Sequence, residues 1–272
     1  MMGSRAYLPF DIGRMIVAPG RSPYTFKAVF GPQALHEKGI LEKISRCFEE
    51  HDASILVLQS SSLPGGKSWI YVAADLERGE ASAIADCISR VDYAEDVEYS
   101  PPAAPGVGID AWGFPPIIGG TRILAVRKPI LEEILRMGWR LMGGGFGIVL
   151  YHTFFKAGKG VFEAIYSKMA RDPETQIRLA EAVFRITGYG VAKVEEFTDE
   201  VARVRVYENI ECESIKGLEN AESSIVRGIV AGFVAGLWGL GINDVAARET
   251  RCIRRGDPYC EIHVERRTQR AT

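Results

Sequence analysis

The chain has 272 residues, of which 47% are hydrophobic and 25% are charged. This length and composition are typical of a soluble protein with one large domain or two small ones. The 33 basic and 35 acidic residues give a formal net charge of −2. This balance excludes the overall positive field that holds polybasic proteins on nucleic acid.

The first residues, MMGSRAYLPFDIG, lack the charged and then apolar plan of a secretory signal. No apolar run reaches the ~18 residues that indicate a membrane-spanning helix. We therefore expect a cytoplasmic protein that does not enter a membrane. The five cysteines are odd in number and too few for a disulfide scaffold. Reduced thiols or a bound metal are the interpretations that this count leaves.

Strand and helix patterns alternate after an N-terminal segment, residues 1–23. Strand patterns cover 24–30, 54–61, 68–76 and 96–100, and helix patterns cover 39–52 and 80–91. The order βαββαβ is a ferredoxin-like unit that packs two helices on one face of an antiparallel sheet. With Gly39 before the first helix, residues 24–100 resemble an ACT domain, a regulatory module that often binds amino acids at dimer interfaces. The other interpretation of Gly39 is ordinary turn geometry.

Residues 101–121, PPAAPGVGIDAWGFPPIIGGT, contain five prolines and five glycines. Neither a helix nor a central strand tolerates this density, so the segment is predicted to be a linker or an extended crossing segment. It separates the first domain from residues 122–272. In that second part, an amphipathic helix pattern over 173–190 precedes alternating strand patterns, VAKVEEFT and EVARVRVYENIECES, which predicts an α+β domain.

The segment SSIVRGIVAGFVAGLWGLGIN, residues 223–243, has glycines at 228, 232 and 236. One face of this predicted helix is nearly smooth, so another backbone or a ring can approach it closely. Tight helix packing and contact with a ligand ring are the two interpretations. Its apolar run is too short to span a bilayer comfortably.

Directly after this helix, Glu249, Cys252 and Cys260 form the pattern E-x-x-C-x7-C around a Gly256-Asp257-Pro258 turn signal. A hairpin at this turn places both cysteines on neighbouring strands, where two thiolates can share one tetrahedral ion and Glu249 can add an oxygen. The alternative is that these cysteines are buried and reduced, or form a cross-strand disulfide.

The glycine-rich helix, the ending V-x-x-x-E-x-x-C-x-x-x-G-D-x-x-C (Val245 to Cys260) and the upstream segment LYHTFFKAGKG occur in the order of the 4-vinyl reductase domain family. Residues 122–265 resemble this family in its archaeal type. Its members include sensory domains that respond to aromatic compounds and a protein of bacteriochlorophyll synthesis. The resemblance implies a 4-vinyl reductase-type α+β domain with the fold shared by vesicle-tethering subunits.

The resemblance also implies a structural zinc centre of three cysteines and one glutamate. The family's remaining cysteine would fall at Val226, so Cys212, in the predicted strand segment NIECES, takes its place here as in archaeal members. With Glu249, Cys252 and Cys260 it completes the predicted ligand set. His263 is the less favoured donor, because it lies three residues beyond Cys260 on the same strand and points to the opposite face.

A sensor of this family implies an apolar ligand pocket. The aromatic side chains near the glycine cluster Gly143 to Gly147, and one on the glycine-rich helix, are the predicted lining. They are Trp139, Phe146, Tyr151, His152, Phe155, Phe162 and Trp238. The alternative is that these residues belong to the ordinary core, which for His152 means a hydrogen-bonded core histidine rather than a partner of a ligand hydroxyl.

We expect a homodimeric sensor that binds a small hydrophobic or aromatic molecule and acts through a protein partner, without direct nucleic-acid contact. The sequence has no G-x-S-x-G, no H-E-x-x-H and no G-x-G-x-x-G after a strand, so we do not expect an enzyme. One alternative is an enzyme or accessory factor for a tetrapyrrole or aromatic substrate. The other is a scaffold that resembles the vesicle-tethering subunits.

Overall fold

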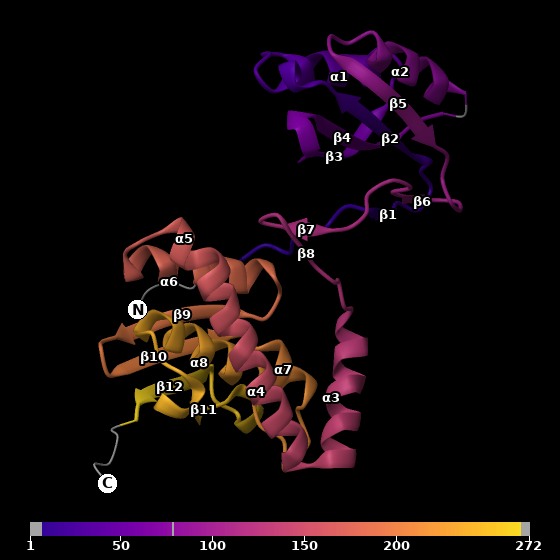
Figure 1. The fold of residues 1–272 in the computed structure, drawn as a ribbon. Helices are drawn as coiled ribbons and strands as arrows, with labels where there is room; N and C mark the ends of the chain where they lie inside the picture. The colour runs from indigo at the N-terminus through magenta and orange to yellow at the C-terminus, as the bar shows by residue number, and fades with distance from the viewer. Residues whose placement is uncertain (1–6, 78, 268–272) are drawn as a thin grey trace. The chain divides into compact units, whose positions relative to one another are not determined.

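A computed structural model describes residues 7–77 and 79–267. It is an α+β structure with several antiparallel sheets. The chain divides into two compact units, Met1–Leu124 and Ala125–Thr272. Figure 1 shows the helices and strands of each unit.

Unit 1 is built on a four-stranded antiparallel sheet in the order β3-β4-β2-β5. Its elements follow one another in the order strand, helix, strand, strand, helix, strand, as the hydrophobic patterns predict. They are β2 (Pro23–Phe30), α1 (Ile40–Glu49), β3 (Ser54–Ser62), β4 (Ser68–Asp75), α2 (Glu80–Ser89) and β5 (Ala94–Ser100).

Both helices cover the same face of this sheet (Figure 1). Their apolar sides are fully buried against the strands, with Ile44 and Phe48 on α1 and Ile84 and Ile88 on α2. Hydrophobic burial therefore attaches each helix to the sheet independently of any covalent link.

Cys47 on α1 and Cys87 on α2 form a disulfide. The expectation of reduced thiols or a metal for the cysteines is therefore wrong for this pair. The two cysteines are 40 positions apart in the sequence, and only the packing of both helices on one sheet face brings them together. No local sequence pattern reports such a pairing.

The opposite face of the sheet is covered by segments from both ends of unit 1. β1 (Met15–Val17) pairs with β6 (Val107–Ile109) as a two-stranded antiparallel ribbon. Arg14 beside β1 lies over the ring of Tyr71, 4.5 Å from its centroid, and pairs with Asp110 at 2.8 Å. The proline-rich segment is thus a crossing segment in its first part. It continues in a small hairpin of β7 (Ile117–Ile118) and β8 (Thr121–Arg122).

Unit 2 combines helices with a four-stranded antiparallel sheet in the order β11-β12-β10-β9. Its strands are β9 (Val191–Phe197), β10 (Val201–Tyr207), β11 (Val245–Arg251) and β12 (Cys260–Arg266). Its helices are α3 (Lys128–Met142), α4 (Gly144–Val161), α5 (Ser167–Met169), α6 (Pro173–Ile186), α7 (Ile210–Ser214) and α8 (Ile225–Trp238), with a π-helical turn, Phe162–Tyr166, after α4.

α4 and α8 pack closely through their glycines. A Cβ atom at Gly232 would lie 2.1 Å from the carbonyl oxygen of Phe155, and one at Gly228 would lie 2.7 Å from that of Tyr151. The smooth face of α8 therefore serves helix packing, the first of its two interpretations. No helix among the described residues is both long enough and apolar enough to cross a membrane.

Candidate metal centre

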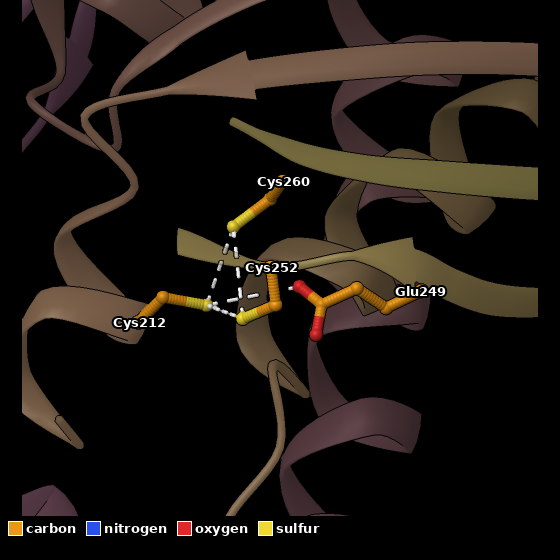
Figure 2. A group of neighbouring side chains, drawn as sticks. All are labelled: Cys212, Glu249, Cys252 and Cys260. Carbon is orange, nitrogen blue, oxygen red and sulfur yellow. Dashed lines mark hydrogen bonds between the residues drawn. The ribbon is translucent and has the colours of Figure 1, made fainter. Parts of the chain in front are cut away.

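Four side chains of unit 2 converge on one point: Cys212, Glu249, Cys252 and Cys260 (Figure 2). Their candidate ligand atoms all lie within 4.8 Å of one another. The Sγ atom of Cys212 is 3.4 Å from that of Cys252, 3.5 Å from that of Cys260 and 3.7 Å from Oε1 of Glu249. All three cysteines are free and buried.

The hairpin of β11 and β12 supplies three of the four side chains. Glu249 lies on β11, Cys252 follows the end of this strand, and Cys260 begins β12. Between the two cysteines, Gly256 adopts a φ of +94°, and the amide of Cys252 donates a 2.8 Å hydrogen bond to Asp257 Oδ2. The turn residues thus bring the two cysteines to the same end of the sheet, as the Gly-Asp-Pro signal predicts.

Cys212 does not lie on a strand, so that part of the prediction is wrong. It belongs to the helix α7, because Glu208 leaves the strand with a φ of +50° and Asn209 caps the helix. The Asn209 Oδ1 atom accepts hydrogen bonds from the amides of Glu211 and Cys212. Although the segment NIECES forms a short helix and not a strand, its cysteine, Cys212, still points to the β11–β12 hairpin.

The donor set and its spacing fit a tetrahedral zinc ion. A zinc–sulfur distance of about 2.3 Å and tetrahedral angles require sulfur atoms about 3.8 Å apart and sulfur–oxygen distances of about 3.5 Å. The three sulfur–sulfur distances here are 3.4, 3.5 and 4.0 Å, and the distance from Cys212 Sγ to Glu249 Oε1 is 3.7 Å. Soft thiolates with one carboxylate favour zinc over magnesium or calcium.

Close contact and burial change the acidity of these groups. Hydrogen bonds with Cys212 and Cys260 lower the pKa of the Cys252 thiol to about 2, and the hydrogen bond to Cys252 raises the pKa of the Cys212 thiol. Burial raises the pKa of Glu249 to about 8. Four acidic groups this close share protons, and a divalent cation would favour the charged form of all four.

Glu211, the neighbour of Cys212, is a further buried residue of this region, and no sequence motif marks it. Its side chain is 1% exposed and caps α8, accepting hydrogen bonds from the amides of Ser224, Ile225 and Val226 at 2.8–2.9 Å. Burial raises the pKa of this carboxyl, whereas the amide hydrogen bonds lower it. The only sequence signal for this contact is an acidic residue next to a candidate ligand. The helix start that it caps lies 14 residues downstream.

The two other positions that the resemblance raised are not part of the cluster. Val226, where the family's cysteine would fall, lies in the first turn of α8 and is buried in the core. His263 is on β12, and its Nε2 atom is 3.8 Å from Glu261 Oε1. Its partly exposed ring lies on the face of the strand opposite Cys260, as the parity of the strand predicts.

The predicted ligand-binding aromatic residues fall into separate contact groups. Trp139 and Phe146 pack edge to face in one core cluster, and Trp139 Nε1 is buried without a hydrogen-bond partner among residues 7–77 and 79–267. Phe155 lies in the core against α8, with Tyr151 packed against it. His152 is exposed.

The remaining two aromatic residues lie at the other end of α8. Phe162 packs on Gly236 and on the ring of Phe233. Trp238 stacks on Phe197, and its Nε1 atom donates a hydrogen bond to the carbonyl of Thr198. These contacts are those of core and edge packing.

The sequence matches no family model and no curated protein. Among solved structures, the chain is similar to the two proteins that follow, among others. One is the phenol-responsive sensory domain of the transcription activator PoxR, with 13% identity, coverage of 55% of this chain and 79% of that one, and a TM-score of 0.49. The other is a vinyl-4-reductase family protein from Methanocaldococcus jannaschii, with 14% identity, coverage of 55% and 100%, and a TM-score of 0.31.

A third similarity is to the ACT domain of the GTP pyrophosphokinase of Chlorobium tepidum. It has 13% identity, coverage of 29% of this chain and 96% of that one, and a TM-score of 0.24. Likeness at this level concerns the fold alone, and function depends on the chemistry of the site.

Proposed function

We propose that unit 2 is a zinc-stabilised sensor module for a small hydrophobic or aromatic molecule. The observation that carries the proposal is the convergence of three buried thiols and one carboxylate with tetrahedral spacing. Four protein ligands fill a tetrahedral shell, so the ion is structural rather than catalytic. It would tie α7 to the β11–β12 hairpin, two elements far apart in the sequence.

Metal analysis of ligand variants tests the zinc proposal. We expect about one zinc per chain in protein purified without added metal, the stoichiometry of one four-ligand site. Cys252→Ser and Cys260→Ser are expected to lose it. The double variant Cys47→Ser/Cys87→Ser is the matched control, because these cysteines lie in unit 1 and are not part of the cluster. Metal retained in the ligand variants, or absent from the wild type, would contradict the proposal.

The buried Nε1 atom of Trp139, which has no hydrogen-bond partner among the described residues, supports a ligand near the start of α8. A buried donor without a partner is costly, and an acceptor oxygen on a ligand would satisfy it. Phe146 and Ile225 belong to the same core cluster and offer apolar contact. We therefore propose an aromatic or hydrophobic ligand with one hydroxyl or carbonyl oxygen, in contact with Trp139.

Ligand binding is measurable by calorimetry with a series of phenols and their methyl ethers. Trp139→Phe keeps the aromatic bulk but removes the donor, and should weaken binding about tenfold, the effect of one lost hydrogen bond. Trp112→Phe is the control, because Trp112 lies in unit 1 and its Nε1 donates to Glu98. Equal affinity for both variants would refute the role of Trp139.

An exposed apolar stripe on α3 favours a second, compatible function in association. Ile130, Ile134, Met137 and Leu141 follow helical spacing and are 43–75% exposed. Contiguous apolar surface of this kind marks interaction sites. We propose that a second copy of the chain covers it. Sedimentation equilibrium of the wild type and of Ile134→Asp/Leu141→Asp tests this: a dimer that the variant does not form is expected, and a monomeric wild type contradicts it.

A further inference from the structure

The two residues of the unit 1 disulfide are among those that line a surface groove between α1 and α2. The groove has a volume of about 560 Å³, within the range of small-molecule sites. Residues of α1 and its N-cap line one side, and the end of α2 with the residues after it lines the other. Both sulfur-bearing residues, Cys47 and Cys87, are among the lining residues.

The two cysteines differ in accessibility. Cys47 is 2% exposed and belongs to the core, whereas Cys87 is partly exposed and packs only at the edge of that core. An incoming thiolate attacks the sulfur that it can reach. Cys87 is therefore the sulfur open to attack, and Cys47 is the leaving group.

Basic side chains surround this bond. Lys38, Lys43, Arg46 and Arg90 line the groove, against three acidic residues. Two of the four are paired, Lys43 with Asp92 and Arg46 with Glu42, while Lys38 and Arg90 have no ion-pair partner in the part of the chain that the structure describes. Nearby cations stabilise thiolates, both the attacking and the departing one, and attract thiols that carry negative charge.

We propose that this groove is a thiol-exchange site and that the Cys47–Cys87 disulfide reacts reversibly with a small anionic thiol. The thiolate attacks Cys87 Sγ, a mixed disulfide forms, the Cys47–Cys87 bond breaks, and Cys47 leaves as a thiolate that takes up a proton. A second thiolate attacks the external sulfur of the mixed disulfide and releases Cys87. The two electrons that reduce the protein come from two external thiols, which leave as one disulfide.

The packing of unit 1 allows this bond to open without unfolding. Ile44 and Phe48 hold α1 on the sheet, and Ile84 and Ile88 hold α2. A reversible site of this kind differs from a permanent cross-link, which would open only when the domain unfolds.

Reduced glutathione, a small anionic thiol, is the probe for this site. The full chain is incubated with it under native conditions and quenched with an alkylating reagent, and peptide mass spectrometry locates the adducts. We expect the adduct on Cys87. When each single variant is given oxidised glutathione, the free cysteine in Cys47→Ser should form the mixed disulfide about tenfold faster than that in Cys87→Ser, because only Cys87 is accessible.

A charge variant tests the groove itself. Arg90→Ala should slow native reduction by glutathione about threefold through loss of electrostatic attraction. Arg21→Ala is the control, because Arg21 lies outside the groove. Reduction that requires denaturant would overturn the proposal and identify a permanent cross-link. An adduct on Cys47 alone, or equal rates in both arginine variants, would also overturn it.

Discussion

Replacing Gly232 with alanine should destabilise unit 2 sharply. The new Cβ would lie 2.1 Å from the carbonyl oxygen of Phe155 and 2.9 Å from the amide nitrogen of Lys159, whereas real Cβ contacts are essentially never shorter than 3.0 Å. Because both neighbouring atoms are backbone, α4 and α8 must separate by about 0.9 Å. Overpacking of this kind costs about 3 kcal/mol, offset by about 1 kcal/mol from the higher helix propensity of alanine.

The net expectation is a loss of about 2 kcal/mol in the free energy of unfolding, measured by urea denaturation followed by far-UV circular dichroism. Gly160→Ala is the matched control on α4, because nothing lies within 4 Å of its Cβ position. This control should be neutral or stabilised by up to about 1 kcal/mol. Equal stability of the two variants would refute the close packing of α4 against α8.

Further predictions concern two buried side chains, the disulfide of unit 1 and the candidate metal centre of unit 2. The Tyr71 hydroxyl is buried and has no hydrogen-bond partner in the part of the chain that the structure describes. Tyr71→Phe should therefore raise the free energy of unfolding by about 1 kcal/mol at neutral pH, and a lower value would contradict this. Burial raises the pKa of Tyr71 to about 12. The unfolded state therefore ionises first, and the wild type should lose stability as the pH rises from about 10 to 12. Tyr71→Phe should not show this loss. The free energy of unfolding of Cys47→Ala/Cys87→Ala should be up to about 4 kcal/mol lower than that of the wild type, because the disulfide links positions 40 apart in the sequence. An unchanged urea midpoint would contradict this. Glu211→Ala leaves three amides of α8 without their acceptor and should cost about 3 kcal/mol or more, whereas a neutral effect would argue against the cap. A strong chelator should lower the melting temperature of the wild type but leave that of Cys260→Ser unchanged.

The parts of the candidate metal centre that sequence could predict are the local ones. Turn chemistry at Gly256 and strand parity are short-range properties, so they place Cys252, Cys260 and Glu249 on one hairpin. Cys212 belongs to the same cluster, but its secondary structure depends on the cap at Asn209, which ends the strand pattern.

Long-range contacts could not be predicted in this way. Helical spacing places Cys47 and Cys87 on buried or half-buried sides of two helices but does not report which faces meet. The carboxylate of Glu211 caps a helix that starts 14 residues later, a contact set by tertiary packing. Aromatic residues near a glycine cluster likewise serve a core as readily as a ligand site, and their contacts here are divided among several groups.

The ribbon of β1 and β6 determines how unit 1 responds to tension. Met15 lies opposite Ile109, so the segment before β1 and the segment after β6 join the ribbon at the same end. A pull on both flanking segments would act along the hydrogen bonds between β1 and β6. These bonds would therefore break one after another, starting from the Met15–Ile109 end. The contacts at that end take the force first: the Arg14–Asp110 ion pair and the hydrogen bond from the Asp110 amide to the Arg14 carbonyl. The ribbon would therefore peel away before the sheet and its two helices unfold.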